Sequence, residues 1–247
     1  MRRFQLFNDK RENYTTKENW CIHCLGANYK RSPKTGRLLV KRNNDHVPSK
    51  CLLKKPYPRD LPTVKICSVC NLSFAPHEEY LAAFLGAVSH NEHLSEKSLS
   101  IFDSNNKLSD SLIQSLEIER NEVGVQVHLN QQRVDVVLAK NAKGHFYFEN
   151  QRVITSEPDL IRMRPMSEFS ASQRAYFEKV DCTGMWSEVG TRAFSREATN
   201  PDFKNGWVMV QSGQYRYVII RKNNEVLIRS VITEEFAVEV FWKNAFN

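Results

Sequence analysis

This 247-residue sequence lacks long apolar runs. No stretch approaches the roughly 20 apolar residues of a transmembrane helix, so we expect no membrane partner. No apolar signal segment follows Met1 either, because charged residues such as Arg2, Arg3 and Asp9 crowd the start. We therefore expect a cytoplasmic location, where cysteines stay reduced. Internal repeats and low-complexity tracts are also missing.

Acidic residues are scarce in the first 70 positions. Residues 1–70 hold 5 Asp and Glu against 16 Lys and Arg, a net charge of +11, whereas residues 71–247 hold 23 against 19, a net charge of −4. A surface without a binding role rarely separates charge this strongly, and a positive field attracts a polyanion. We therefore expect a nucleic acid, most of all DNA, as the partner. This asymmetry argues against a pure protein-interaction adaptor.

Four of the six cysteines form two Cys-x-x-Cys steps: Cys21 with Cys24, and Cys67 with Cys70. Each step lets two thiolates converge on one tetrahedral metal, and two steps supply the four ligands of a structural Zn²⁺ site. A redox motif and disulfides are the alternatives. Two copies of the step, with Cys51 and Cys182 outside any pairing pattern, favour metal over thiol chemistry. A reducing compartment argues against disulfides.

The segment between the cysteine pairs carries groups suited to phosphodiester hydrolysis. Asp45 and His46 are adjacent, and Asn71 directly follows the ligand Cys70. Carboxylate and amide oxygens suit Mg²⁺ or Mn²⁺, and a neutral imidazole can take a proton from the attacking water. We therefore expect Asp45 and Asn71 to bind a catalytic cation and His46 to act as the base. His77, in the next helix, is a further candidate ligand.

These motifs resemble the HNH endonucleases. The matching stretches are Cys21-x-x-Cys24, Asp45-His46-Val47-Pro48 and Cys67-x-x-Cys70-Asn71, within residues 20–86. The resemblance implies a ββα-metal fold stapled by zinc, with His46 as general base and with Asp45 and Asn71 on the metal. Family members usually place an Asn shortly before the second cysteine pair, where this chain has Leu61-Pro62-Thr63-Val64.

Hydrophobic periodicity predicts an α+β chain in two parts. The resemblance implies an HNH-like zinc and nuclease domain in residues 1–100, and we expect residues 101–247 to form a mixed domain with antiparallel strands that positions DNA or a partner protein. Alternation at a period of two predicts strands, and a period near 3.6 with capping residues predicts helices. The predicted strands are 37–41, 123–129, 134–138, 146–148, 207–211, 215–221 and 226–232; the predicted helices are 75–86, 109–119, 170–180 and 234–242.

The function expected from these patterns is a metal-dependent DNA endonuclease of prokaryotic or phage type. The alternative is a catalytically inactive zinc protein that binds nucleic acid through the same basic surface. Asp45 and Asn71 favour the enzyme, since binding alone requires neither. The missing middle Asn keeps the alternative open.

Overall fold

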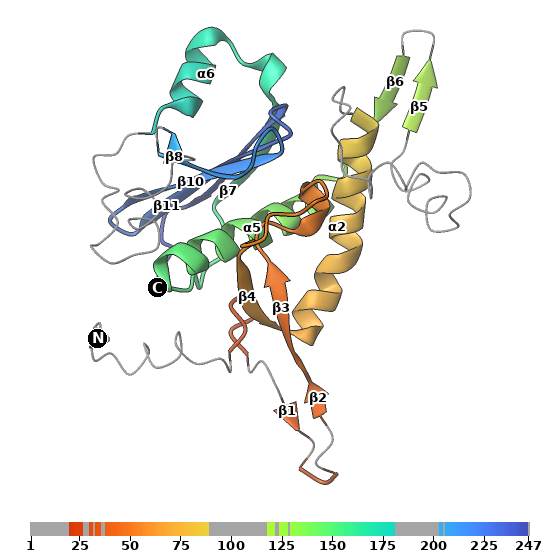
Figure 1. Ribbon diagram of the computed structural model, residues 1–247, viewed down its shortest axis with the longest axis vertical. Helices are drawn as coiled ribbons and strands as arrows, with labels where there is room; N and C mark the ends of the chain where they lie inside the picture. Colours follow the sequence, from red (N-terminus) through yellow and green to blue (C-terminus); the bar gives the residue numbers. More distant parts are fainter. Residues whose placement is uncertain are drawn as a thin grey trace.

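A computed structural model describes residues 20–26, 30–31, 33–35, 38–88, 118–121, 124–127, 129–180, 203–204 and 206–246. These residues form an α+β structure whose paired strands are all antiparallel (Figure 1). Among the helices described, none is both long and apolar enough to span a bilayer.

A two-stranded hairpin followed by a long helix carries the predicted site. Strand β3 (Arg42–His46) pairs with β4 (Thr63–Cys67), and helix α2 (Ser68–Val88) begins directly after β4. The connection contains the short 3₁₀ helix η1 (Lys50–Leu52) and a proline-rich loop that includes Pro56, Pro58 and Pro62. The predicted helix 75–86 is therefore confirmed, but it starts at Ser68, so Pro76 lies inside it rather than in its first turn.

Two small hairpins accompany this unit. Strands β1 (Lys30–Arg31) and β2 (Leu38–Val40) pair with each other ahead of β3, in agreement with the strand predicted at 37–41. Strands β5 (Ile118–Asn121) and β6 (Gly124–Val127) form the second hairpin. Most of the predicted helix 109–119 lies outside the described residues, and its last two positions belong to β5.

A six-stranded antiparallel sheet forms most of the C-terminal half. Its strand order is β7-β12-β11-β10-β9-β8. The strands are β7 (Leu160–Pro165), β8 (Phe203–Lys204), β9 (Trp207–Gln211), β10 (Tyr215–Lys222), β11 (Glu225–Ile232) and β12 (Phe236–Trp242). The predicted strands at 207–211, 215–221 and 226–232 are confirmed in β9, β10 and β11.

The strands predicted at 134–138 and 146–148 are wrong, because helix α5 (Gln131–Asn150) covers both. Val134, Val137, Leu138 and Phe146 are buried; the last three follow Val134 by three, four and twelve residues, which fits a stripe on one side of a helix. The Asn130 side chain accepts a hydrogen bond from the Arg133 backbone N–H and so caps the first turn. The alternating valines that predict a strand are a coincidence within this stripe.

The helix predicted at 234–242 is also wrong, because the segment is strand β12, hydrogen-bonded to β11 and β7 on its two sides. Val238, Val240 and Trp242 bury one face, a period of two that β-branched and aromatic residues favour. By contrast, the helix predicted at 170–180 is confirmed as α6 (Ala171–Glu178). Its start is fixed by a reciprocal capping box between Ser170 and Gln173.

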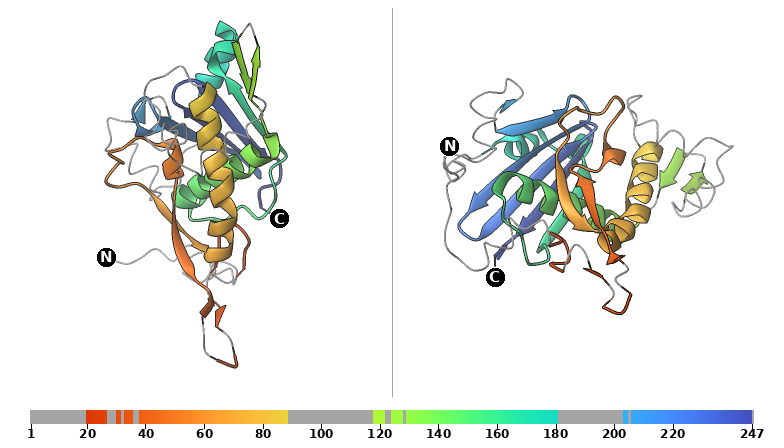
Figure 2. Two further views of the ribbon diagram at one scale, coloured as in Figure 1. Left: turned by 90° about the vertical axis from the view of Figure 1, so that its right-hand side faces the viewer. Right: turned by 60° about the horizontal axis from the view of Figure 1, so that its bottom comes forward.

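Helix α5 lies between the β3–β4 hairpin and the large sheet (Figure 2). The largest buried cluster joins residues of α2, such as Tyr80 and Leu81, to residues of α5 and of the sheet, such as Val134 and Trp242. Helix α6 packs on the opposite sheet face through Phe177, beside Trp207. The two parts predicted from the sequence thus share one core, while the boundary near residue 100 falls outside the described residues.

Candidate functional site

The four cysteines of the two Cys-x-x-Cys steps converge at the base of the hairpin–helix unit. The sulfur atoms of Cys21, Cys24, Cys67 and Cys70 all lie within 4.8 Å of one another. Sulfurs around a tetrahedral metal at about 2.3 Å are separated by about 3.8 Å. The Sγ atoms of Cys24 and Cys67 are 3.8 Å apart. This cluster can hold a metal ion.

Local hydrogen bonds favour the thiolate form of one of these cysteines, Cys67. Burial would raise the pKa of the Cys67 thiol, but hydrogen bonds, first that of the Cys70 backbone N–H, lower it below its ordinary value. This N–H lies 3.4 Å from Cys67 Sγ because Cys67 ends β4 and Cys70 lies in the first turn of α2. The thiolate is the form that binds metal, so the turn favours ligation.

Asp45 lies in a buried charged network rather than at an open edge. It is 7% exposed, and its Oδ1 accepts a hydrogen bond of 2.9 Å from Lys140 Nζ of α5. Lys140 also donates to Glu78 Oε1 of α2 and, at 3.0 Å, to Ser49 Oγ. The second carboxylate oxygen, Asp45 Oδ2, is buried without a hydrogen-bond partner among the described residues. One oxygen of Asp45 is therefore available to a cation.

The charge states of this network follow from its geometry. Burial would lower the pKa of Lys140, but the charges of Asp45 and Glu78 raise it above its ordinary value. Burial raises the pKa of the Asp45 carboxyl, and the Lys140 ammonium opposes that effect. The ammonium is thus charged at neutral pH and supports an ionised Asp45 beside it.

Helix α5 also fixes the chain just after β3. Asn141 Oδ1 accepts a hydrogen bond of 2.8 Å from the Ser49 backbone N–H. Ser49 Oγ donates to Glu78 Oε1 at 2.5 Å. Gly144 allows the helix to come close, because a Cβ atom there would lie 2.8 Å from Val47 Cγ2. These contacts hold the residues on both sides of the turn after His46.

His46 ends strand β3 and is half-buried. Its pKa is lowered by burial first and then by the positive charges of Lys50 and Lys140. The imidazole is therefore neutral at pH 7, which is the form that a general base requires. The backbone beside it is held by a hydrogen bond of 2.9 Å from the Val47 N–H to the Pro62 carbonyl.

Asn71 and His77 both lie on α2. Asn71 is partly buried in the first turn, one residue after Cys70. His77 is partly buried one position before Glu78, and its Nδ1 atom is buried without a hydrogen-bond partner among the described residues. Burial and the charge of Arg133 lower its pKa. Within the described ranges, the four cysteines are the only converging set of three or more His, Cys, Asp or Glu ligands, so Asp45, His77 and Glu78 form no three-ligand cluster.

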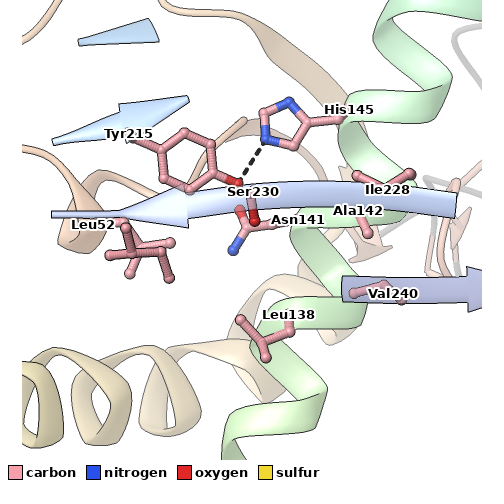
Figure 3. Close-up of a pocket in the computed structure, with 10 residues that line it drawn as sticks. Leu52, Leu138, Asn141, Ala142, His145, Tyr215, Ile228, Ser230 and Val240 are labelled. Carbon is pink, nitrogen blue, oxygen red and sulfur yellow. Dashed lines mark hydrogen bonds between the residues drawn. The ribbon is translucent and has the colours of Figure 1, made fainter. Parts of the chain in front are cut away.

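A small cavity between α5 and the sheet does not provide a substrate site. It is lined by Leu138, Asn141 and His145 of α5 and by Tyr215 and Ser230 of the sheet (Figure 3). His145 Nε2 lies 3.0 Å from the Tyr215 hydroxyl. The cavity volume of about 10 Å³ is on the order of one water molecule. The cavity is therefore too small for a substrate larger than a water molecule.

Comparison with known proteins identifies no relative. No family model, no curated protein and no solved structure matches this chain. The interpretation of the site therefore depends on its own residues.

Sequence reasoning misses the partners of Asp45. Lys140, Glu78, Ser49 and Asn141 join it from two helices and a turn. Lys140 lies 95 positions from Asp45, and the segment around it is predicted as a strand. One signal was present: Lys140 and Lys143 lie between two apolar stretches, residues 136–139 and 146–148. A buried lysine requires a carboxylate partner.

Proposed function

We propose that this chain is a metal-dependent endonuclease of the HNH type that hydrolyses phosphodiester bonds of DNA. The observation that carries the proposal is the end of β3, where Asp45 keeps one buried oxygen without a hydrogen bond and His46 is neutral and half-buried. The antiparallel hairpin and following helix, joined by the cysteine cluster, support a ββα-metal unit.

The cysteine cluster is proposed to hold structural Zn²⁺. Four thiolates in tetrahedral reach form a closed set, which leaves no ligand position for water or substrate. Because Cys67 ends β4 and Cys70 lies in the first turn of α2, the metal would fix the angle between hairpin and helix. Its role is to hold Asn71 and Asp45 in one frame, and it takes no part in hydrolysis.

The chain's own residues perform two tasks in the proposed reaction. The imidazole of His46 accepts the proton of the water that attacks phosphorus, which its lowered pKa permits at neutral pH. Asp45 Oδ2 and the Asn71 amide oxygen are the proposed ligands of Mg²⁺ or Mn²⁺, with His77 as a further candidate. A divalent cation bound there supplies charge stabilisation for the leaving oxygen.

A catalytically inactive, nucleic-acid-binding protein is the second candidate. Two observations favour it. The Lys140 ammonium already compensates Asp45 at Oδ1. The segment where HNH proteins carry an extra Asn supplies only the Pro62 backbone carbonyl beside His46. DNA is the partner in both proposals, and the C-terminal half would position it or a partner protein.

A plasmid-nicking assay with Mg²⁺ or Mn²⁺ separates the two functions. His46→Ala is expected to slow cleavage by roughly 10²–10⁴-fold, the usual contribution of a general base. Zinc content and DNA affinity should stay unchanged, because a half-buried His at a strand end contributes little to either. A His77→Ala variant tests the further candidate ligand: slower cleavage that a higher Mg²⁺ or Mn²⁺ concentration partly restores would assign His77 to the metal ion.

The pH profile adds a second test of His46. Because its pKa is lowered, the base loses activity only as pH falls through a value below 6.5. Cleavage by His46→Ala at the wild-type rate would assign the base to another residue. A wild type that binds DNA but does not cleave it, whichever metal is added, would favour the inactive alternative.

A further inference from the structure

Lys140 is a buried charge whose hydrogen bonds are all used within the protein. Its side chain is 2% exposed. An ammonium has three donors, and here they reach Asp45 Oδ1, Ser49 Oγ and Glu78 Oε1. The ring of Phe74 lies 5.4 Å from Nζ and covers a further side. Lys140 therefore has no donor left for a phosphate.

The three partners of Lys140 come from the elements that make the proposed site. Asp45 belongs to β3, Ser49 to the turn after it, and Glu78 to α2. Lys140 itself comes from α5, which packs against the sheet of the C-terminal half. The Lys140 ammonium thus links β3, the turn after it and α2 to helix α5 by hydrogen bonds.

We propose that Lys140 is a positioning residue and the resident counter-cation of Asp45, so that the C-terminal half completes the site. This inference rests on the proposed function. Lys140 holds Oδ1 and leaves Oδ2 for a metal ion, which fixes the direction in which Asp45 presents its charge. It also separates Asp45 from Glu78, which would otherwise repel each other in a buried setting.

The same arrangement sets the affinity for a divalent cation. With both carboxylates ionised, Asp45, Glu78 and Lys140 together carry one negative charge. Without Lys140 they would carry two only at a higher pH, because burial and the charge of Glu78 both raise the pKa of Asp45. A positive charge next to the ligand weakens cation binding by Coulomb repulsion, and the effect is large where water is excluded. Lys140 therefore fixes the orientation of the Asp45 carboxylate and at the same time lowers its affinity for a divalent cation.

Titration of the zinc-loaded full chain with Mn²⁺, followed by the electron paramagnetic resonance signal of free Mn²⁺, tests this proposal. Lys140→Met removes the charge and keeps most of the volume. At a pH high enough to ionise Asp45 in the variant, we expect Mn²⁺ to bind at least about tenfold more tightly, because the repelling charge is gone. Cleavage should nevertheless be slower at saturating Mn²⁺, because Asp45 is no longer oriented. Asp45→Asn added to Lys140→Met should remove the gain in affinity.

Lys143→Met is the matched control. Lys143 lies on the same helix, is also buried, and pairs with the exposed Glu157 at 3.0 Å rather than with Asp45. We expect it to leave Mn²⁺ affinity within about twofold of wild type. An equal gain in both variants would mean that net charge, and not the position of Lys140, sets affinity, and would overturn the proposal.

If Lys140→Met does not fold, a second variant, Glu78→Gln, tests the proposal. Glu78 is partly exposed, so Glu78→Gln is expected to fold. It removes one negative charge from the network and should weaken Mn²⁺ binding, again without loss of zinc. Unchanged Mn²⁺ affinity in whichever variant folds overturns the proposal. A wild type that cleaves no DNA would defeat the proposed function alone, since the Mn²⁺ titration does not depend on cleavage.

Discussion

Gly144→Ala tests how closely helix α5 packs against Val47, the residue that follows β3. A Cβ atom at Gly144 would lie 2.8 Å from Val47 Cγ2 and 3.1 Å from Val47 Cγ1. Ordinary contacts between carbon atoms are about 3.5–4.0 Å, so the methyl group intrudes by close to 1 Å. Val47 is 1% exposed and β-branched, so it has neither space nor an easy alternative rotamer.

Two effects of opposite sign decide the change in stability. Alanine is better than glycine inside a helix by about 1 kcal/mol. Overpacking a filled core costs about 1–3 kcal/mol, and the depth of this overlap favours the upper part of that range. We therefore expect Gly144→Ala to lower the free energy of unfolding by about 1–2 kcal/mol.

Urea unfolding of the zinc-loaded protein measures this difference. The double variant with Val47→Ala is the control, because removing the two methyl groups makes room for the new one. We expect the double variant to lose less stability than the two single changes added together, with a coupling of about 1 kcal/mol or more. Stabilisation of the single variant by about 1 kcal/mol would refute the close approach of α5 to β3.

Two further predictions concern the metal and the nucleic acid. Cys67→Ser should lose the bound metal and unfold the hairpin–helix unit, because structural zinc contributes on the order of 10 kcal/mol to such small units. Elemental analysis of the wild type should give one zinc per chain. A folded wild type that contains no zinc would contradict the proposed zinc site. DNA affinity should fall steeply as the salt concentration rises, because bound counterions are released from the DNA. Lys41 and Arg42 are exposed at the start of β3, so the double variant Lys41→Glu, Arg42→Glu should show a weaker salt dependence. An affinity that is the same at low and moderate salt would exclude an interface dominated by phosphate contacts.

Local sequence signals predict those parts of the structure that local interactions determine. The two Cys-x-x-Cys steps predict a metal-binding cluster because each step brings its own two ligands together, and the four sulfurs do converge. Ser170 and Gln173 predict the start of α6 because both halves of the capping box lie within one turn. Strands β9 to β11 follow from alternating apolar residues between short turns.

The errors arise where tertiary packing decides between two local readings. Residues 134–138 contain alternating apolar side chains, but a helix there buries Val134, Val137 and Leu138 against α2 and the sheet. Residues 236–242 fit a helical stripe equally well, but β11 and β7 offer hydrogen bonds on both sides. Periodicity over so few residues cannot separate these cases.

The environment of Asp45 is non-local in the same way. Asp45 and His46 are adjacent in sequence, so their chemistry can be read from the motif. The ammonium that compensates Asp45 lies on a helix 95 positions away, and no pattern within the motif predicts it. The motif predicts which groups would react, whereas the packing of α5 places the positive charge beside Asp45.

The shared core limits how far the hairpin–helix unit can act as an exchangeable module. Helix α2 buries Tyr80, Leu81 and Leu85 in a cluster that also contains residues of α5 and of strands of the large sheet. If residues 20–88 were grafted onto another protein, these side chains would meet water or a surface of the wrong shape. Evolution and engineering can therefore vary the outer face of the sheet, whereas the unit, α5 and the inner sheet face have to change together.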